Sequence, residues 1–314
     1  MSAETAFVFP GQGSQSINML KELTSKYTEV RNTFKEASDI LSHDLYKLLT
    51  KGTTEELSQT TNTQPIMLTA SVAIWRIWTN STNHMPTVMA GHSLGEYSAL
   101  VCGDSLSFKS ALHLVSKRAE FMQNSPLGSE GSMAAILGLE KDTIVELCEK
   151  ISTKHDKVEA VNFNAPLQTV IAGKKTQVNK VMQEAKSKGA SKSVLLPVKV
   201  PSHCSLMKEV AEKFSEELKK VKIKTPKVKI IHNCDAQSHN SPQHILDALI
   251  KQLYMPVRWV DTICNISANG IEHYVEIGPG RVLSSLIKRI DKSFTTYSVN
   301  DIKSLNYTLE ELMA

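Results

Sequence analysis

Short apolar runs rich in β-branched residues alternate with segments of helical periodicity, and this alternation limits the fold more than any other feature of the chain. The clearest runs are residues 6–9, 87–90, 228–231 and 274–277. Strands that alternate with helices favour an α/β fold with a mainly parallel sheet. With 314 residues, the chain is long enough for two domains or for one large domain with an insertion.

Helical periodicity is most regular after Pro65, where apolar residues recur every three or four positions until about residue 80. Because proline is favoured in the first turn of a helix, we expect Pro65 to open this helix. Further helices are predicted at residues 107–123, 206–219, 242–254 and 282–290.

The middle of the chain has a different order of elements. Strands are predicted at 133–137, 158–162, 169–172 and 193–196, and helices at 142–150 and 174–188. The order β-α-β-β-α-β is that of a ferredoxin-like module. We therefore predict that a ferredoxin-like subdomain, residues 128–197, is inserted into a larger α/β core of residues 1–127 and 198–314. Pro126-Leu127-Gly128-Ser129 and Pro197 would be its hinges.

Composition and charge exclude several classes of protein. Hydrophobic residues make up 41% and charged residues 22%, which is typical of a globular protein. The formal net charge is +4, without the arginine-rich, aromatic-containing blocks of nucleic-acid-binding proteins. The apolar stretch 66–75 is too short to span a bilayer, and the first residues do not resemble a secretory signal. We expect neither a nucleic-acid nor a membrane partner.

The cysteines indicate a reducing compartment. The chain has five of them, an odd number, spread along the sequence with no CxxC pair. Neither a disulfide framework nor a zinc site is expected from this pattern. We therefore expect a cytoplasmic protein without a metal.

The strongest local signal is Gly91-His92-Ser93-Leu94-Gly95, a GxSxG sequence between a predicted strand and a predicted helix. This context is that of a nucleophile elbow, in which a serine occupies a sharp, strained turn. Glycines are needed on both sides because the neighbouring segments are pressed together. The pattern predicts Ser93 as a nucleophile in an α/β-hydrolase-like core. A chance GxSxG in a loop is the alternative.

The glycine-rich loop 9–15, Phe-Pro-Gly-Gln-Gly-Ser-Gln, follows the first predicted strand. It does not match a nucleotide-binding loop, because Ser16 stands where a third glycine is required and no Gly-Lys-Ser/Thr follows. Two interpretations remain open from the residues alone. The loop presents the Gln12 amide to a reacting centre, or it is a structural tight turn.

A serine nucleophile needs a base, and His203 has the most suggestive setting of the ten histidines. It follows Pro201, which stiffens the chain, and precedes a predicted helix. Judged alone, it could equally be a surface or core histidine. His92 is expected to pack beneath the turn, because adjacent side chains on such a turn point in different directions.

Five segments occur in the order and at the spacing of malonyl-CoA:acyl carrier protein transacylases. The chain closely resembles this family from about residue 5 to about residue 290. The segments are residues 9–15, Gly91-His92-Ser93-Leu94-Gly95-Glu96-Tyr97, Ser116-Lys117-Arg118, Pro201-Ser202-His203 and Glu276-Ile277-Gly278-Pro279-Gly280.

The resemblance implies a role for each matching residue. Ser93 would accept the acyl group, with His203 as general base and acid. The amides of Gln12 and Leu94 would form the oxyanion hole. A backbone carbonyl, expected at Gln252, would orient His203 in place of an acidic residue.

Three further residues are implied to bind substrate. Arg118 would pair with the free carboxylate of the malonyl group, for which a guanidinium has the matching fork of donors. The alternative is a surface arginine paired with Glu120 or with solvent. Gln64 and Asn162 match family positions that face the cleft, but as polar residues in predicted turns they could equally be caps.

The expected activity is a double displacement. A malonyl group would pass from malonyl-CoA to the serine, and then to the phosphopantetheine thiol of acyl carrier protein, for fatty acid synthesis. Malonyl-CoA would be a substrate, no bound cofactor is expected, and the protein is expected to be a monomer. The alternatives are a serine hydrolase or thioesterase, a noncatalytic module that docks carrier protein, and an acyltransferase of a polyketide pathway.

Overall fold

A five-stranded parallel sheet forms the centre of the larger part of the molecule. The computed structural model describes residues 4–125, 128–198 and 200–313. Strand order in the sheet is β7-β2-β1-β8-β9, and all neighbouring strands are parallel. The predicted α/β fold is confirmed. The strands are β1 (Thr5–Phe9), β2 (Val88–Gly91), β7 (Lys229–Ile231), β8 (His273–Ile277) and β9 (Thr295–Val299).

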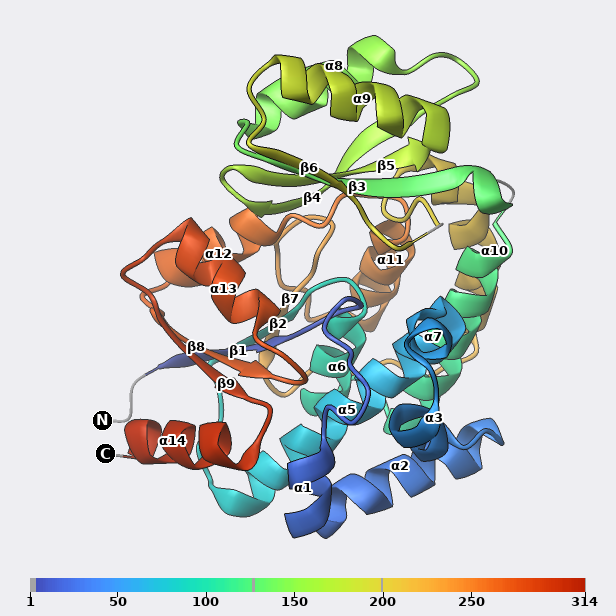
Figure 1. Cartoon of the computed structure of the whole chain (residues 1–314). Coiled ribbons are helices and arrows are strands. Elements are labelled where there is room, and N and C mark those ends of the chain that lie inside the picture. The colour runs from blue at the N-terminus through green and yellow to red at the C-terminus, as the bar shows by residue number, and fades with distance from the viewer. Residues whose placement is uncertain (1–3, 126–127, 199, 314) are drawn as a thin grey trace.

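Helices cover both faces of this sheet (Figure 1). On β1, Phe7 and Phe9 enter one buried cluster with Trp78, whereas Ala6 and Val8 enter another with Trp259. Alternate residues of a strand face opposite sides, and here both sides are apolar. This is why the strands appear in the sequence as continuous apolar runs.

The helices of this part include several that periodicity does not predict, namely α1 to α4, α12 and α14. These helices are short or have irregular apolar patterns, and they are stabilised by packing on neighbouring elements. In chain order the helices are α1 (Lys21–Lys26), α2 (Thr28–Leu41), α3 (Leu45–Lys51), α4 (Thr54–Ser58), α5 (Thr60–Ser81), α6 (Gly95–Cys102), α7 (Phe108–Gln123), the 3₁₀ turn η2 (Ser205–Met207), α10 (Lys208–Lys219), α11 (Pro242–Gln252), α12 (Trp259–Ala268), α13 (Val282–Ile290) and α14 (Ile302–Met313). Among the described helices, none combines the length and the apolar character that a bilayer-spanning segment requires.

The middle of the chain forms a separate four-stranded antiparallel sheet with the order β4-β5-β3-β6. Helices α8 and α9 cover one face of it, and the other face lies above the core (Figure 1). The predicted ferredoxin-like order is confirmed. The elements are η1 (Gly128–Glu130), β3 (Gly131–Leu137), α8 (Lys141–Ile151), β4 (Val158–Ala165), β5 (Gln168–Lys174), α9 (Lys175–Ser187) and β6 (Lys192–Leu195).

Each face of the small sheet has its own packing. Ile136 packs with Ile144 of α8 and Val178 of α9, whereas Met133 and Ala135 on the same strand join the large cluster of the core. The division into residues 1–127 with 198–314 and 128–197 stays a prediction. Its hinge residues Pro126 and Leu127 lie outside the described residues.

The prediction that Pro65 opens a helix is wrong. Helix α5 begins at Thr60, and Pro65 lies inside it. A proline in this position removes one helical hydrogen bond. The turn before it is supported by side chains, since Thr63 Oγ1 donates to the carbonyl oxygen of Gln59 at 3.0 Å.

The turn between β2 and α6 depends on two glycines. A Cβ on Gly91 would lie 1.9 Å from the carbonyl carbon of Gly95, and a Cβ on Gly95 would lie 1.9 Å from the carbonyl oxygen of Phe9. Ser93 between them has a φ of 52°, a left-handed conformation that non-glycine residues seldom adopt. The elbow is therefore pressed against the end of β1.

Replacing Gly95 by alanine should lower the free energy of unfolding by about 3 kcal/mol or more, because either the start of α6 or the end of β1 must move to make room for the Cβ. Ser98→Ala in the same helix is the control, since its buried hydroxyl has no hydrogen-bond partner among the described residues. It should change stability by less than about 1 kcal/mol. Urea denaturation measures both, and wild-type stability of Gly95→Ala would contradict the close packing.

Candidate active site

Ser93 and His203 meet although they are far apart in the sequence. Ser93 Oγ lies 2.7 Å from Nε2 of His203. His203 also has a left-handed backbone, with a φ of 64°. Such conformations cost energy and tend to occur at functional sites. The two strained residues therefore face each other across one hydrogen bond.

The backbone at the end of α11 orients His203. Its Nδ1 lies 2.7 Å from the carbonyl oxygen of Gln252, and its backbone N–H donates to the carbonyl oxygen of Leu253 at 3.0 Å. Because a carbonyl oxygen only accepts, Nδ1 carries the proton and Nε2 faces Ser93 as an acceptor. Among the described residues, no carboxylate contacts this ring.

The surroundings of His203 keep the imidazole neutral. Burial and the positive charge of Arg118 lower the pKa of His203 to about 3, against the opposing effect of the Gln252 carbonyl. A neutral imidazole with a free Nε2 lone pair is able to take a proton from a serine hydroxyl.

Arg118, on α7, lies buried beside the nucleophile. Its Nη2 donates to Ser93 Oγ at 3.2 Å and to Oε1 of Gln252 at 3.0 Å, and its Nη1 donates to Oε1 of Gln64 at 2.8 Å. Nε has no hydrogen-bond partner among the described residues. The alternative of a surface pair with Glu120 is wrong, because Lys117 makes that contact at 2.8 Å.

Asn162 borders the cavity around Ser93, and Gln64 contacts Arg118, although the prediction that both lie in turns is wrong. Gln64 belongs to α5, where its Nε2 donates to Thr60 Oγ1 at 2.8 Å. Asn162 belongs to β4, and its buried Oδ1 has no partner among the described residues. His92 borders the same cavity, where its Nε2 lies 2.8 Å from Oδ1 of Asn164, and the described residues show no hydrogen bond between its ring and Ser93.

The loop after β1 lies directly against the elbow. A Cβ on Gly11 would be 2.5 Å from the carbonyl oxygen of His92 and 3.7 Å from the backbone nitrogen of Leu94. Within the described residues, the backbone N–H groups of Gln12 and Leu94 donate to no protein acceptor. Two unpaired amide donors thus lie close to Ser93.

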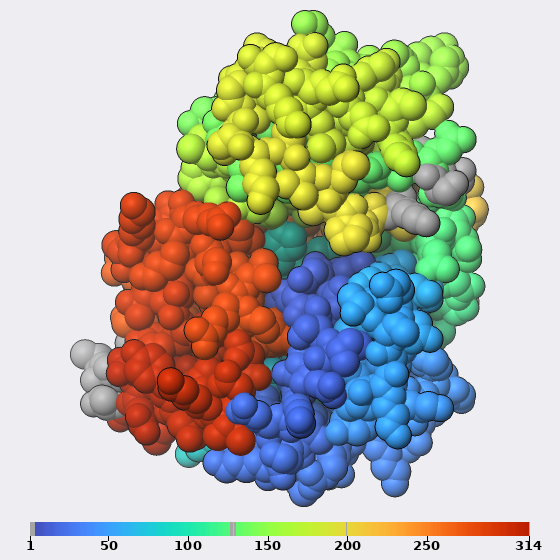
Figure 2. Space-filling model, in the orientation of Figure 1, coloured from blue at the N-terminus to red at the C-terminus, as the bar shows by residue number. Residues whose placement is uncertain are grey.

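These groups line a cavity between the core and the inserted unit. It has a volume of about 100 Å³ and is bordered by Gln12, Ser93, Arg118, Asn162 and His203. A wider cleft of about 810 Å³ shares Gln12 and Val198 with it. Figure 2 shows the hollow between the inserted unit, coloured green to yellow, and the blue and red parts of the core.

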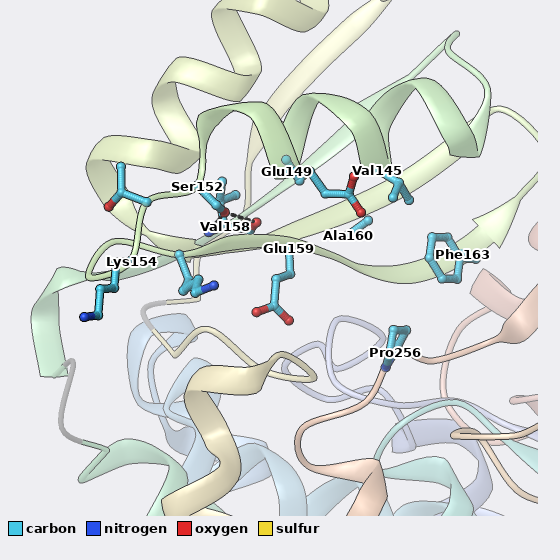
Figure 3. Close-up of a pocket in the computed structure, with 12 residues that line it drawn as sticks. Val145, Glu149, Ser152, Lys154, Val158, Glu159, Ala160, Phe163 and Pro256 are labelled. Carbon is cyan, nitrogen blue, oxygen red and sulfur yellow. Dashed lines mark hydrogen bonds between the residues drawn. The ribbon is translucent and has the colours of Figure 1, made fainter.

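A separate pocket of about 520 Å³ lies between α8 and β4, outside this site (Figure 3). There Glu159 points from β4 toward the core and accepts a hydrogen bond from the backbone N–H of Ser205 at 2.9 Å. The inserted unit thereby holds the segment that follows His203.

Across residues 4–125, 128–198 and 200–313, no cluster of His, Cys, Asp or Glu has the arrangement of a metal site.

Comparisons with known proteins show the family of this chain. The model of the acyl transferase domain matches residues 6–307. The malonyl CoA-acyl carrier protein transacylase of Salmonella typhimurium is 46% identical over 306 residues, which is 98% of this chain and 99% of that protein. The chain belongs to this transacylase family. The Bacillus subtilis protein of the same name is 40% identical over 99% of this chain and 98% of its own.

Solved structures of this family have the same fold. The transacylase from Coxiella burnetii superposes with a TM-score of 0.98 at 43% identity, covering 100% of this chain and 99% of that one. A malonyl-transacylase solved with its type II PKS acyl-carrier protein has a TM-score of 0.96 at 44% identity, covering 98% and 100%. The expected enzyme class, an acyltransferase, is confirmed.

Two residues, Asn233 and Glu96, support the elbow in roles that the sequence pattern did not indicate. Asn233 accepts from the backbone N–H of Ser93 and donates to the carbonyl oxygen of Gly91, both at 2.6 Å. Glu96 accepts from the backbone N–H of Asn233 at 3.0 Å. Asn233 follows β7, and its position at the carboxyl end of a parallel strand is the signal that could have identified it.

The imidazole of His203 should stay neutral in the folded protein well below the ordinary histidine pKa of about 6.5. In NMR spectra of histidine-labelled protein, the resonance that His203→Asn removes should keep its neutral-form shift at about pH 5.5. The unfolded chain binds a proton there that the native protein does not, so His203 should make unfolding easier as pH falls below about 6.5. A midpoint near 6.5 in the folded protein would contradict this.

Proposed function

We propose that this protein transfers a malonyl group from malonyl-CoA to the phosphopantetheine thiol of acyl carrier protein through an acyl-Ser93 intermediate. One observation carries the choice of acyl group. The buried guanidinium of Arg118 lies 3.2 Å from Ser93 Oγ and contacts only neutral groups among the described residues. A buried cation is costly without an anion. The free carboxylate of a malonyl group would supply that anion.

The chemistry needs only groups already next to Ser93. His203 Nε2 would take the hydroxyl proton as Oγ attacks the thioester carbonyl, and the protonated imidazole would return the proton to the leaving thiolate. The amides of Gln12 and Leu94 would stabilise the oxyanion of each tetrahedral intermediate. Losing one such donor typically costs ~10²–10³ in rate. In the second half, His203 would deprotonate the incoming pantetheine thiol, whose sulfur attacks the acyl carbonyl. The imidazolium would then return the proton to Ser93 Oγ as the acyl–oxygen bond breaks.

Transfer to a thiol requires that water be kept from the acyl-serine. The small cavity around Ser93 supports this, because it leaves little space beside a bound acyl group. The wider cleft that adjoins it at Gln12 and Val198 has room for a pantetheine arm. Both the coenzyme A thioester and the carrier protein carry this arm, so one entrance would serve both halves of the reaction.

The biological setting follows from the relatives. Their name includes the acyl carrier protein, and we place this protein in fatty acid synthesis. A polyketide pathway is the second candidate, since one structural relative was solved with a type II PKS acyl-carrier protein. We further propose a cytoplasmic monomer that needs no bound cofactor. The five free cysteines support a reducing compartment.

Replacing Ser93 by alanine should abolish the covalent malonyl adduct, because no other residue is proposed to accept the acyl group. The adduct is detected by intact mass after incubation with malonyl-CoA. Ser98→Ala, which removes another buried serine hydroxyl near the elbow, is the matched control and should form the adduct normally. An undiminished adduct on Ser93→Ala would disprove the assignment.

Replacing Arg118 by alanine should lower kcat/KM for malonyl-CoA by roughly two to three orders of magnitude. The substrate carboxylate would be left buried without its cation, at a cost of about 3 to 5 kcal/mol. Acetyl-CoA has no carboxylate and should lose much less. Arg118→Lys should recover the activity only in part, because an ammonium lacks the fork of donors.

Lys117→Ala is the control for Arg118, since it removes the neighbouring cation, which pairs with Glu120 at the surface. It should leave the ratio of malonyl to acetyl transfer unchanged. Equal losses for both acyl groups in Arg118→Ala would show that the guanidinium does not recognise the carboxylate.

A further inference from the structure

Glu96 is a fully buried carboxylate directly behind Ser93, in the first turn of α6. Its Oε2 accepts from the backbone N–H of Asn233 at 3.0 Å and from Nε2 of Gln252 at 2.9 Å, and its Oε1 lies 2.8 Å from Nδ1 of His232. Among the described residues, the His232 ring is the sole basic side chain in contact with it, and no lysine or arginine pairs with it. Burying a carboxylate without a lysine or arginine partner costs free energy. The hydrogen-bond partners of Glu96 therefore indicate why it is placed here.

The side chain of Gln252 connects Glu96 to the reacting groups. Its Nε2 donates to Glu96 and, at 3.0 Å, to the carbonyl oxygen of Ser93, while its Oε1 accepts from Nη2 of Arg118 at 3.0 Å. The same residue supplies the backbone carbonyl that orients His203. Nucleophile, base and guanidinium thus all contact one glutamine.

The two ends of the Gln252 amide are not interchangeable here. A guanidinium has only donors, whereas Oε2 of Glu96 and the carbonyl oxygen of Ser93 both accept from the other end of the amide. If the amide turned over, its NH₂ group would face the Arg118 donors and its oxygen would face the Glu96 carboxylate. Glu96 and the Ser93 carbonyl oxygen on one side, and Arg118 on the other, therefore permit a single orientation.

We propose that Glu96 is a positioning residue, whose carboxylate holds the Gln252 amide in the orientation that presents Oε1 to Arg118 and so fixes the guanidinium beside Ser93. The proposal rests on the proposed function, because it assigns Arg118 to the carboxylate of the acyl group. Glu96 also supports the elbow through Asn233, but a loss by that route would affect all acyl groups alike. A change in the ratio of malonyl to acetyl transfer therefore distinguishes an effect through Gln252 from an effect through Asn233.

The test compares the rates of Ser93 acylation by malonyl-CoA and by acetyl-CoA, measured by intact mass. Glu96→Leu and Gln252→Met should each lower the malonyl-to-acetyl ratio about tenfold, equivalent to about 1.4 kcal/mol. Glu96→Gln should recover most of the ratio, because its amide oxygen still accepts from Gln252. Gln243→Met, at the exposed start of the same helix, is the control and should keep the wild-type ratio.

A double variant tests the route directly. If Glu96 acts on selectivity through Gln252, Glu96→Leu combined with Gln252→Met should have the same ratio as Gln252→Met alone. Losses that multiply, or an equal slowing of both acyl groups in Glu96→Leu, would overturn the proposal. If Glu96→Leu does not fold, a ratio in Glu96→Gln as low as that of Gln252→Met would overturn it. A wild-type protein that forms no malonyl adduct would instead overturn the proposed function.

Discussion

The close contact between the elbow and the end of β1 is the constraint on which the site depends. At Gly95 no side chain separates α6 from the Phe9 carbonyl, and at Gly11 none separates the first loop from the elbow. Parallel pairing of β1 with β2 brings these segments to the same edge of the sheet. The Gln12 and Leu94 amides are therefore held by backbone packing, which needs no rearrangement during a reaction.

The site around this contact contains a cation, Arg118, that has no acidic partner among the described residues. Arg118 is held by the amide oxygens of Gln64 and Gln252, and Gln64 is linked in turn through Thr60 to Oε1 of Gln12. Neutral partners orient a guanidinium without neutralising it. The positive charge therefore persists in the site, where a substrate carboxylate would meet it in the proposed reaction, and it helps to keep His203 unprotonated.

Sequence alone predicted the features that depend on local pattern and missed those that depend on tertiary contacts. The elbow was predictable because Gly91, Ser93 and Gly95 lie within five consecutive residues. The setting of His203 after Pro201 favoured it over the other histidines, and its role as the base came from the family resemblance. The start of α5 was mispredicted because its polar first turn is stabilised by surrounding groups rather than by apolar periodicity. Asn233 reaches Ser93 only through the pairing of β7 with β2, which no local pattern specifies.

The central claim is that the acyl group on Ser93 is passed to a thiol and not to water. The most direct measurement mixes isolated malonyl-enzyme with carrier protein that has, or lacks, its phosphopantetheine arm, and follows the fate of the malonyl group over one turnover. The account predicts rapid transfer of the malonyl group to carrier protein that has the phosphopantetheine arm. With carrier protein that lacks the arm, it predicts slow loss of the adduct. Release of free malonate at the same rate in both mixtures would contradict it and would indicate a hydrolase.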